Sequence, residues 1–299
     1  MFEKICLPTW WRIVILIASD FFETGEILTM SYFNICLVLA LVLCQSVPAF
    51  SEENSKVKLP TKEKFHLFLL VGQSNMAGRG KVEEQDLVPH PRVLSLNKGN
   101  EWQPAVDPIH FDKPKYIGVG LGRTFGIEVA EANPKITVGL IPCAVGGSPI
   151  ASWEPGALDK ATGTHPYDDT LARMKIALPM GKLVGILWHQ GESDTTPEKA
   201  AVYESKLHAL IARLRKELDA PDVPFIAGQM GIFAEQPWSD VKKQVDAVHQ
   251  QLPTKLTATA FVDAKGLNHK GDEIHFDSAA YRELGRRYAL AYATLSASP

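Results

Sequence analysis

The stretch FLLVGQSNMAGRG, residues 68–80, begins as an apolar run and changes at Gly72 into small and polar residues. Its apolar part extends upstream to FHLFLLV, residues 65–71. This run is too continuously apolar for a half-exposed strand and favours a strand buried on both faces of a parallel sheet. The polar part, Gly-Gln-Ser-Asn, is either a plain loop or a sharp exit from strand to helix that exposes one hydroxyl. The rest of the chain decides between the two.

Four further apolar runs recur along the chain, separated by segments with helical spacing. The runs are ITVGLIP, LVGILWH, PFIAGQM and TATAFVD, at residues 136–142, 183–189, 224–230 and 257–263. Apolar side chains at helical spacing occur in residues 205–220, 240–252 and 278–295. The alternation predicts one three-layer α/β/α domain, residues 52–299, with a doubly wound and mainly parallel sheet. In such a sheet, ligands bind at the carboxyl ends of the strands.

The first fifty residues differ in kind from the rest. An apolar run over residues 35–44 is followed by small residues, which is the layout of a secretory signal peptide. We expect translation to start at Met30, residues 1–51 to be a leader, and cleavage to fall near Ala49 to Ser51. The protein would then be secreted or periplasmic, with no stable membrane insertion after processing. The alternative is an uncleaved N-terminal anchor.

The charge balance of the chain indicates which classes of binding partner to expect. The chain has 31 Lys and Arg against 34 Asp and Glu, a net charge of −3, and no basic cluster. A nucleic-acid-binding protein needs a basic stripe that displaces counterions, so no nucleic-acid partner is expected. The balance favours a neutral substrate, and the sequence does not indicate an oligomeric state.

Two motifs follow the first two runs directly. Ser74 comes after residues 65–71, where it is either the N-cap of a helix or a nucleophile at the positive end of that helix. Gly146 and Gly147 come after residues 136–142. They either permit a tight turn or bring backbone N–H groups close to a ligand, as an oxyanion hole requires.

Two further motifs carry titratable groups. WHQGESD, residues 188–194, contains possible metal ligands, but the chain has neither an H-E-x-x-H helix nor a cysteine pair, so no metal and no cofactor are expected. GDEIHFDSAAYRELGRRYA, residues 271–289, places Asp272 three residues before His275. A carboxylate at this spacing can reach the imidazole and set its tautomer. The alternative is a surface loop with a satisfied histidine.

Together these motifs supply a hydroxyl, two glycines, an amide and an Asp-x-x-His pair, which are the parts that acyl transfer requires. The blocks GQSNMAGRG, GGS, HQGES and DEIHF resemble the SGNH hydrolase superfamily, and more narrowly its branch of sialate O-acetylesterases and acetylxylan esterases. The resemblance spans about residues 65 to 290. It implies a flavodoxin-like SGNH hydrolase fold and the removal of O-acetyl groups from carbohydrates.

The resemblance also implies roles for individual residues. Ser74 would be the nucleophile, His275 the general base, and Asp272 the group that orients it. The oxyanion hole would combine the Ser74 N–H, a backbone N–H from Gly146 or Gly147, and the side-chain amide of Gln190. Of the two glycines, Gly146 better fits the Gly-x-Thr/Ser spacing of the superfamily, with Ser148 as its third residue.

Supporting roles fall to Gln73, Asn75 and Glu192. Glu192 could hold His275 in place of Asp272, or brace the turn at Ser74. The stretch at residues 68–80 is then a nucleophile turn, in which Gly72 and Gly78 let the backbone approach closely.

Two other functions remain open from the sequence. One is a secreted carbohydrate-binding protein that keeps the fold without catalysis, although such a protein usually lacks one member of the Ser/His/Asp set. The other is a lipase or arylesterase of the same superfamily, which would need a long apolar groove. The substrate could be acetylated xylan or a sialic-acid-like sugar. Three tryptophans in predicted loops could stack on a sugar ring or pack in the core: Trp102, Trp153 and Trp238.

Overall fold

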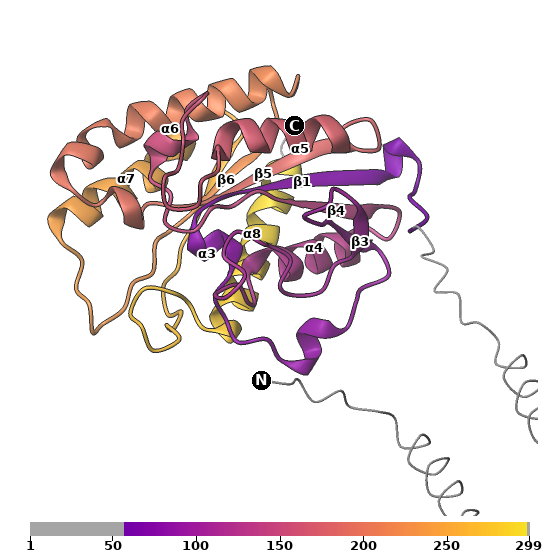
Figure 1. The fold of residues 1–299 in the computed structure, drawn as a ribbon, viewed down its shortest axis with the longest axis horizontal. Coiled ribbons are helices and arrows are strands. Elements are labelled where there is room, and N and C mark those ends of the chain that lie inside the picture. The colour runs from indigo at the N-terminus through magenta and orange to yellow at the C-terminus, as the bar shows by residue number, and fades with distance from the viewer. Residues whose placement is uncertain (1–56, 298–299) are drawn as a thin grey trace, which may run out of the picture. The chain divides into compact units, whose positions relative to one another are not determined.

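A seven-stranded sheet forms the middle of the described chain, in the order β3-β2-β4-β1-β5-β6-β7 (Figure 1). The structure is a computed structural model that describes residues 57–297. The predicted leader, with its start and its cleavage positions, lies outside these residues. Strands β2 and β3 pair antiparallel, and every other neighbouring pair is parallel. The mainly parallel sheet confirms the predicted fold class.

Five of the seven strands coincide with the predicted apolar runs. The strands are β1 Phe65–Gly72, β2 Val93–Leu96, β3 Trp102–Pro104, β4 Thr137–Pro142, β5 Lys182–His189, β6 Phe225–Gly228 and β7 Thr259–Val262. The two strands not predicted, β2 and β3, have four and three residues, too few for a hydrophobic period to show. They extend the sheet beyond β4.

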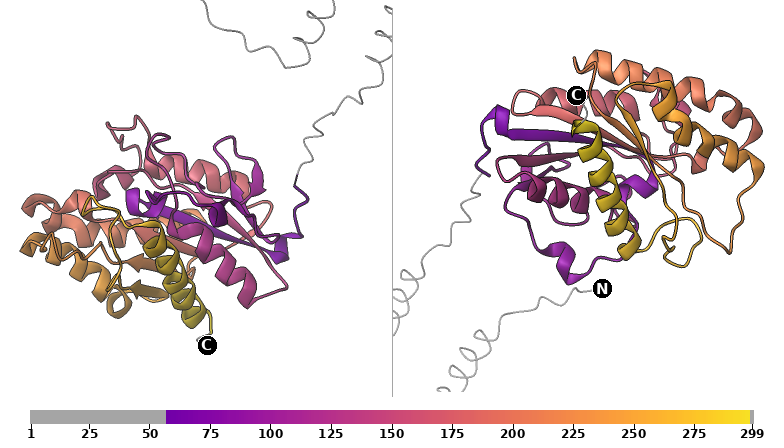
Figure 2. Two further views of the ribbon diagram at one scale, coloured as in Figure 1. Left: turned by 90° about the horizontal axis from the view of Figure 1, so that it is seen from below. Right: turned by 180° about the vertical axis from the view of Figure 1, so that it is seen from behind.

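Helices cover both faces of the sheet (Figure 2). One face packs against α5 Pro166–Ala177, α6 Pro197–Glu217 and α7 Asp240–Lys255; the other packs against α4 Leu121–Ala132 and α8 Ser278–Ala297. The short helices are η1 Lys62–Lys64, α3 Ser74–Ala77, η2 Glu84–Leu87, η3 Ile150–Trp153 and η4 Glu192–Asp194. The three-layer α/β/α arrangement is confirmed. Within residues 57–297, no helix combines the length and the apolar character needed to cross a membrane.

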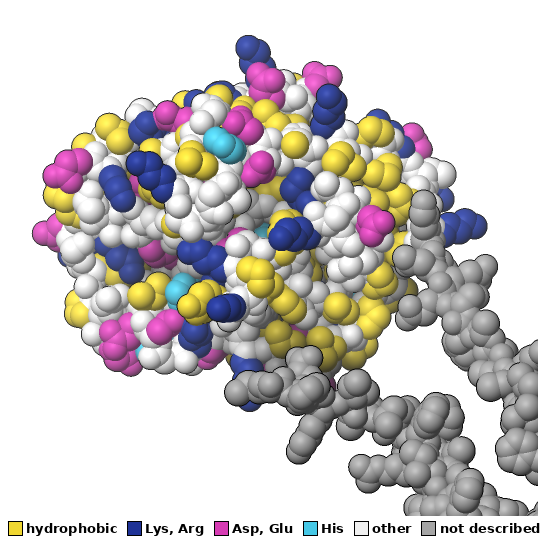
Figure 3. Space-filling model, viewed as in Figure 1, with side chains coloured by type: hydrophobic (Ala, Val, Ile, Leu, Met, Phe, Trp, Pro, Cys, Tyr) yellow, Lys and Arg dark blue, Asp and Glu magenta, His cyan; other side chains and the backbone are white. Residues whose placement is uncertain are grey.

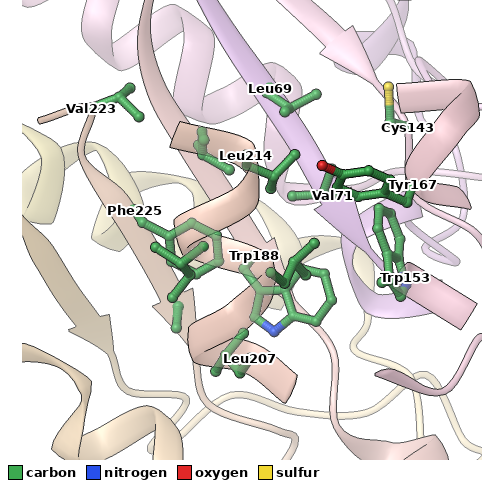
Figure 4. Close-up of a cluster of buried hydrophobic side chains, with 14 of the residues drawn as sticks. Leu69, Val71, Cys143, Trp153, Tyr167, Trp188, Leu207, Leu214, Val223 and Phe225 are labelled. Atoms are coloured by element: carbon green, nitrogen blue, oxygen red, sulfur yellow. The ribbon is translucent and has the colours of Figure 1, made fainter. Parts of the chain in front are cut away.

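Strand β1 contributes side chains to both cores, as its unbroken apolar sequence predicts. Leu69 and Val71 belong to the core beneath α5, α6 and α7, while Phe68 and Leu70 belong to the core beneath α4 and α8. All four are fully buried. Figure 4 shows Leu69 and Val71 near Leu214 of α6. This two-sided burial is typical of a central parallel strand and explains why no polar residue alternates along it.

The chain leaves β1, β4 and β5 at one edge of the sheet, with the three loops side by side. Beyond the regular strands, the Val145 N–H donates to the Gly72 carbonyl at 2.9 Å, and the Gln73 N–H donates to the His189 carbonyl at 2.9 Å. Gly72 has φ of 133°, and a methyl group there would overlap the His189 backbone. Only glycine permits this approach. The loops that follow all three strands therefore converge on α3.

Candidate active site

Ser74, His275 and Asp272 form a connected row of hydrogen bonds. The Ser74 Oγ lies 3.0 Å from His275 Nε2, and His275 Nδ1 lies 2.7 Å from Asp272 Oδ2. Ser74 is the first residue of α3, immediately beyond the end of β1 (Figure 1). Although 201 residues separate Ser74 from His275, the fold brings together the three side chains that the sequence singled out.

The loop that carries His275 is shaped by the same carboxylate that contacts the ring. Asp272 Oδ1 accepts the backbone N–H groups of Ile274 and His275 at 3.1 and 2.8 Å. Burial by itself would raise the pKa of Asp272, but the hydrogen bonds from His275 and from the Ile274 N–H outweigh it and hold that pKa below its usual value. The carboxyl is therefore ionised at neutral pH.

An ionised Asp272 determines how the imidazole of His275 is protonated. A carboxylate only accepts hydrogen bonds, so the ring must place a proton on Nδ1. In the neutral ring, Nε2 is then a lone-pair acceptor facing the Ser74 hydroxyl. Lys270 Nζ lies 3.4 Å from Asp272 Oδ2, a contact that sequence reasoning missed. The arrangement can take a proton from Ser74 and stabilise the resulting imidazolium.

Glu192 has a different position from Asp272. Its Oε1 accepts from Asn75 Nδ2 at 2.6 Å, and the same amide group donates to the Ile274 carbonyl at 3.1 Å. Asn75 Oδ1 in turn accepts the Tyr281 hydroxyl at 2.7 Å. Of the two roles open to Glu192, the geometry matches the brace on the Ser74 turn. The sequence did not predict the role of Tyr281, because a tyrosine inside a helix gives no sign that its hydroxyl is hydrogen-bonded to a site residue.

The backbone N–H groups near Ser74 contradict the expectation that Gly146 is the better oxyanion donor. The Gly146 N–H donates to Asp112 Oδ2 at 2.7 Å, so it is not free to meet a substrate. The N–H groups of Ser74 and Gly147 make no hydrogen bond to any of residues 57–297, and both residues line the same cleft. Gly147, and not Gly146, therefore fits an oxyanion hole. Sequence spacing could not reveal that a distant aspartate takes the first N–H.

Gln190 does not present its amide to the cleft, which corrects the prediction. It is fully buried, and its Nε2 donates to the Ser148 carbonyl at 3.1 Å and to Asp194 Oδ2 at 2.5 Å. Its Oε1 accepts the Tyr203 hydroxyl at 2.7 Å. Both amide hydrogens are thus used in holding neighbouring loops together. Gln73 lines the cleft instead, its Oε1 accepting the Ser193 N–H at 3.3 Å.

The cleft over these groups has a volume of about 680 Å³ and is open to solvent. Lys and Arg side chains gather near the middle of the face in Figure 3. The three tryptophans considered for sugar stacking do not line it. Trp153 is fully buried, the Trp102 ring lies 4.7 Å from that of Phe65, and Trp238 donates to a backbone carbonyl.

Among residues 57–297, no group of three or more His, Cys, Asp or Glu side chains could hold a metal ion.

The sequence profile of the family described as carbohydrate esterase, sialic acid-specific acetylesterase matches residues 64–294. A probable carbohydrate esterase of Arabidopsis thaliana is 33% identical over 246 residues, which cover 76% of this chain and 89% of that protein. A solved structure of an Arabidopsis thaliana protein has 31% identity and a TM-score of 0.68, and covers 79% of this chain and 99% of that one.

Two more distant structures share the fold. A protein named NanS has 19% identity and a TM-score of 0.65, with 80% of this chain and 99% of that chain covered. A carbohydrate acetylesterase from Xanthomonas citri has 20% identity and a TM-score of 0.59, with 77% of this chain and 56% of that chain covered. At these identities the likeness concerns the fold alone. The family profile covers nearly all of the described chain, and its match carries the assignment: the chain belongs to the carbohydrate esterase, sialic acid-specific acetylesterase family, whose members remove O-acetyl groups from carbohydrates.

Proposed function

We propose that this protein hydrolyses O-acetyl esters of carbohydrates through an acyl-enzyme on Ser74. The observation that carries the proposal is the row of hydrogen bonds from Ser74 Oγ through His275 to Asp272, at 3.0 and 2.7 Å. It lies at the carboxyl edge of the sheet, in an open cleft. A hydroxyl next to a correctly protonated imidazole is the arrangement that activates a serine nucleophile.

The proposed reaction has two halves. In the first, His275 Nε2 takes the Ser74 proton as Oγ attacks the acetyl carbonyl, and the protonated ring then returns that proton to the departing sugar oxygen. The N–H groups of Ser74 and Gly147, with the amide of Gln73, are the proposed oxyanion donors. In the second half, water activated by His275 attacks the acetyl-enzyme and releases acetate. No cofactor takes part in this scheme.

The character of the cleft bears on the class of ester. Among the described residues that line it, the large apolar side chains are Ile117, Ile274 and the exposed ring of Tyr116. A lipase or arylesterase would need an extended apolar surface for its acyl chain, and a short acetyl group needs none. The family and the names of the relatives favour a carbohydrate as the alcohol. Acetylated xylan and a sialic-acid-like sugar are both candidates.

The test is acetate release from acetylated xylan, acetylated sialic acid and 4-nitrophenyl acetate. We expect the protein to release acetate from a carbohydrate, and Ser74→Ala to lower kcat by about three orders of magnitude or more. Ser205→Ala, which removes an exposed hydroxyl on α6, is the matched control and should leave the rate unchanged. Undiminished activity in Ser74→Ala would exclude the acyl-enzyme. Sugar binding without turnover would favour a non-catalytic binding protein, and activity on aryl or long-chain esters alone a lipase or arylesterase.

A further inference from the structure

A buried carboxylate lies against the turn that carries the proposed oxyanion donor. Asp112 Oδ2 accepts the Gly146 N–H at 2.7 Å and also contacts Arg79 Nη2 at 2.7 Å. The two side chains of this ion pair are 2% and 5% exposed. A methyl group on Gly146 would overlap both of them, so the pair presses directly on the turn.

This placement has an electrostatic consequence for the proposed reaction. The tetrahedral intermediate gathers negative charge next to the Gly147 N–H, and an uncompensated aspartate one residue away would oppose it. Arg79 cancels the charge of Asp112, which leaves the Gly146–Gly147 turn neutral. Of the two N–H groups of this neutral turn, only that of Gly147 is left for the oxyanion, because that of Gly146 is bonded to Asp112.

Lys113 supplies a positive charge at this place. Its Nζ lies 3.6 Å from the position that a Gly147 Cβ would occupy, and its Cδ lies 3.5 Å from that of Gly146. The side chain therefore runs along the turn, inside the same cleft as Ser74. Its ammonium makes no hydrogen bond or ion pair with any side chain or carbonyl of the described residues. Arg79, Asp112 and Lys113 together give the turn a net positive charge.

We propose that Lys113 is a further catalytic residue, whose ammonium stabilises the oxyanion beside the Gly147 N–H. The proposal rests on the proposed esterase function. When the bond from Ser74 Oγ to the acyl carbon forms, the Ser74 proton passes to His275 Nε2 and the carbonyl π pair moves onto oxygen. That oxygen then carries a full negative charge, and the ammonium compensates it. When the ester bond breaks, the electron pair returns to the carbonyl and the proton passes to the sugar oxygen.

Lys113 thereby takes over work that Gly146 and Gln190 cannot do, because their N–H groups are bonded elsewhere. Lys98 is the matched control, because it is an exposed lysine that does not line the cleft.

The experiment compares Lys113→Met, Lys113→Arg and Lys98→Met with the parent protein, using 4-nitrophenyl acetate as an uncharged substrate without a sugar. We expect Lys113→Met to lower kcat by about 10- to 100-fold while KM changes less than about twofold. Lys113→Arg keeps the charge and should recover most of the rate. Lys98→Met should stay within about twofold of the parent protein in kcat.

The role of Lys113 would be overturned by an unchanged kcat in Lys113→Met, by an equal loss in Lys113→Met and Lys98→Met, or by a Lys113→Arg variant as slow as Lys113→Met. A change confined to KM, on acetylated sugars that carry a carboxylate, would also overturn it and would assign Lys113 to substrate binding. Failure of the esterase function itself is distinct, because the parent protein would then release no acetate in a Ser74-dependent way.

Discussion

Two carboxylates, Asp272 and Glu192, hold the hydrogen-bonded row of Ser74 and His275 in place. Asp272 contacts the ring of His275, and Glu192 contacts Asn75, the residue after Ser74. Glu192 therefore acts on the serine side of the row and Asp272 on the histidine side. The two carboxylates are not interchangeable, although each lies in a sequence motif that predicts a catalytic role.

Exchanging each carboxylate for its amide separates these roles. Asp272→Asn should leave the fold intact but favour the wrong imidazole tautomer, and lower kcat by up to about 10⁴-fold. Glu192→Gln keeps an oxygen that can accept from Asn75, so we expect a loss in kcat of less than about tenfold. Steady-state kinetics and thermal midpoints of both variants, under one set of conditions, make the comparison. A Glu192→Gln enzyme slower than Asp272→Asn, at unchanged thermal midpoint, would reverse the two assignments.

The general base gives a second prediction at this scale. His275 Nε2 is the ring atom in contact with the Ser74 hydroxyl, so His275→Ala should lower kcat by about three orders of magnitude with little change in KM. His165→Ala is the control, because His165 is exposed and does not line the cleft. A loss below about tenfold in His275→Ala would remove this residue from the mechanism.

Sequence reasoning found those site residues whose signal is local. Ser74 follows a strand directly, and Asp272 reaches His275 across three residues. It missed Arg79 and Asp112, because an ion pair between positions 79 and 112 leaves no pattern along the chain. Neighbouring side chains at the end of a strand point in different directions, so the motif HQGES could not show whether Gln190 faces the cleft or the interior.

At the scale of elements, the position of Ser74 depends on how closely β1 approaches β5. The chain exits β1 at Gly72, which pairs with His189 at the end of β5. The five long apolar runs made these central strands predictable, since a strand buried on both faces must be apolar throughout. The short β2 and β3 escaped prediction because three or four residues cannot display a period.

Gly72→Ala tests this close approach. The added methyl would overlap the His189 backbone and also require φ of 133°, so we expect a loss of folding stability greater than the roughly 1 kcal/mol that backbone strain alone costs. Gly266→Ala is the matched control, because Gly266 also has a positive φ but nothing lies within 4 Å of an added methyl. Chemical unfolding of both variants measures the difference. Equal losses would mean that the approach of the two strands does not restrict residue 72.

For the molecule as a whole, we propose export by the N-terminal segment. The apolar run at residues 35–44 and the small residues near Ala49 favour cleavage between residues 49 and 52. N-terminal sequencing of the protein recovered from the medium or periplasm should find one of these positions. An intact terminus at Met1 or Met30 on a membrane-bound product would indicate an anchor instead.

The interior of the molecule predicts how its stability depends on pH. Three histidines are buried, His110, His189 and His249, and burial lowers the pKa of each to about 3. His189 and His249 are hydrogen-bonded to the hydroxyls of Tyr288 and Tyr203 at 3.1 and 2.8 Å. In the native protein all three histidines stay neutral down to about pH 3. In the unfolded chain they become charged near the usual histidine pKa of about 6.5.

The unfolded chain therefore binds more protons than the native protein between about pH 3 and pH 6.5, the usual histidine pKa. The stabilising effect is complete above pH 6.5 and is lost as the pH falls. In the middle of this window each histidine adds about 1.4 kcal/mol per pH unit to the slope of the unfolding free energy against pH. All three together add about 4 kcal/mol per pH unit. Urea unfolding between pH 4 and 7 measures it. His249→Gln should reduce the slope by about one proton, while His165→Gln, at an exposed position, should not. A slope that His249→Gln leaves unchanged would show that His249 is already charged in the native protein.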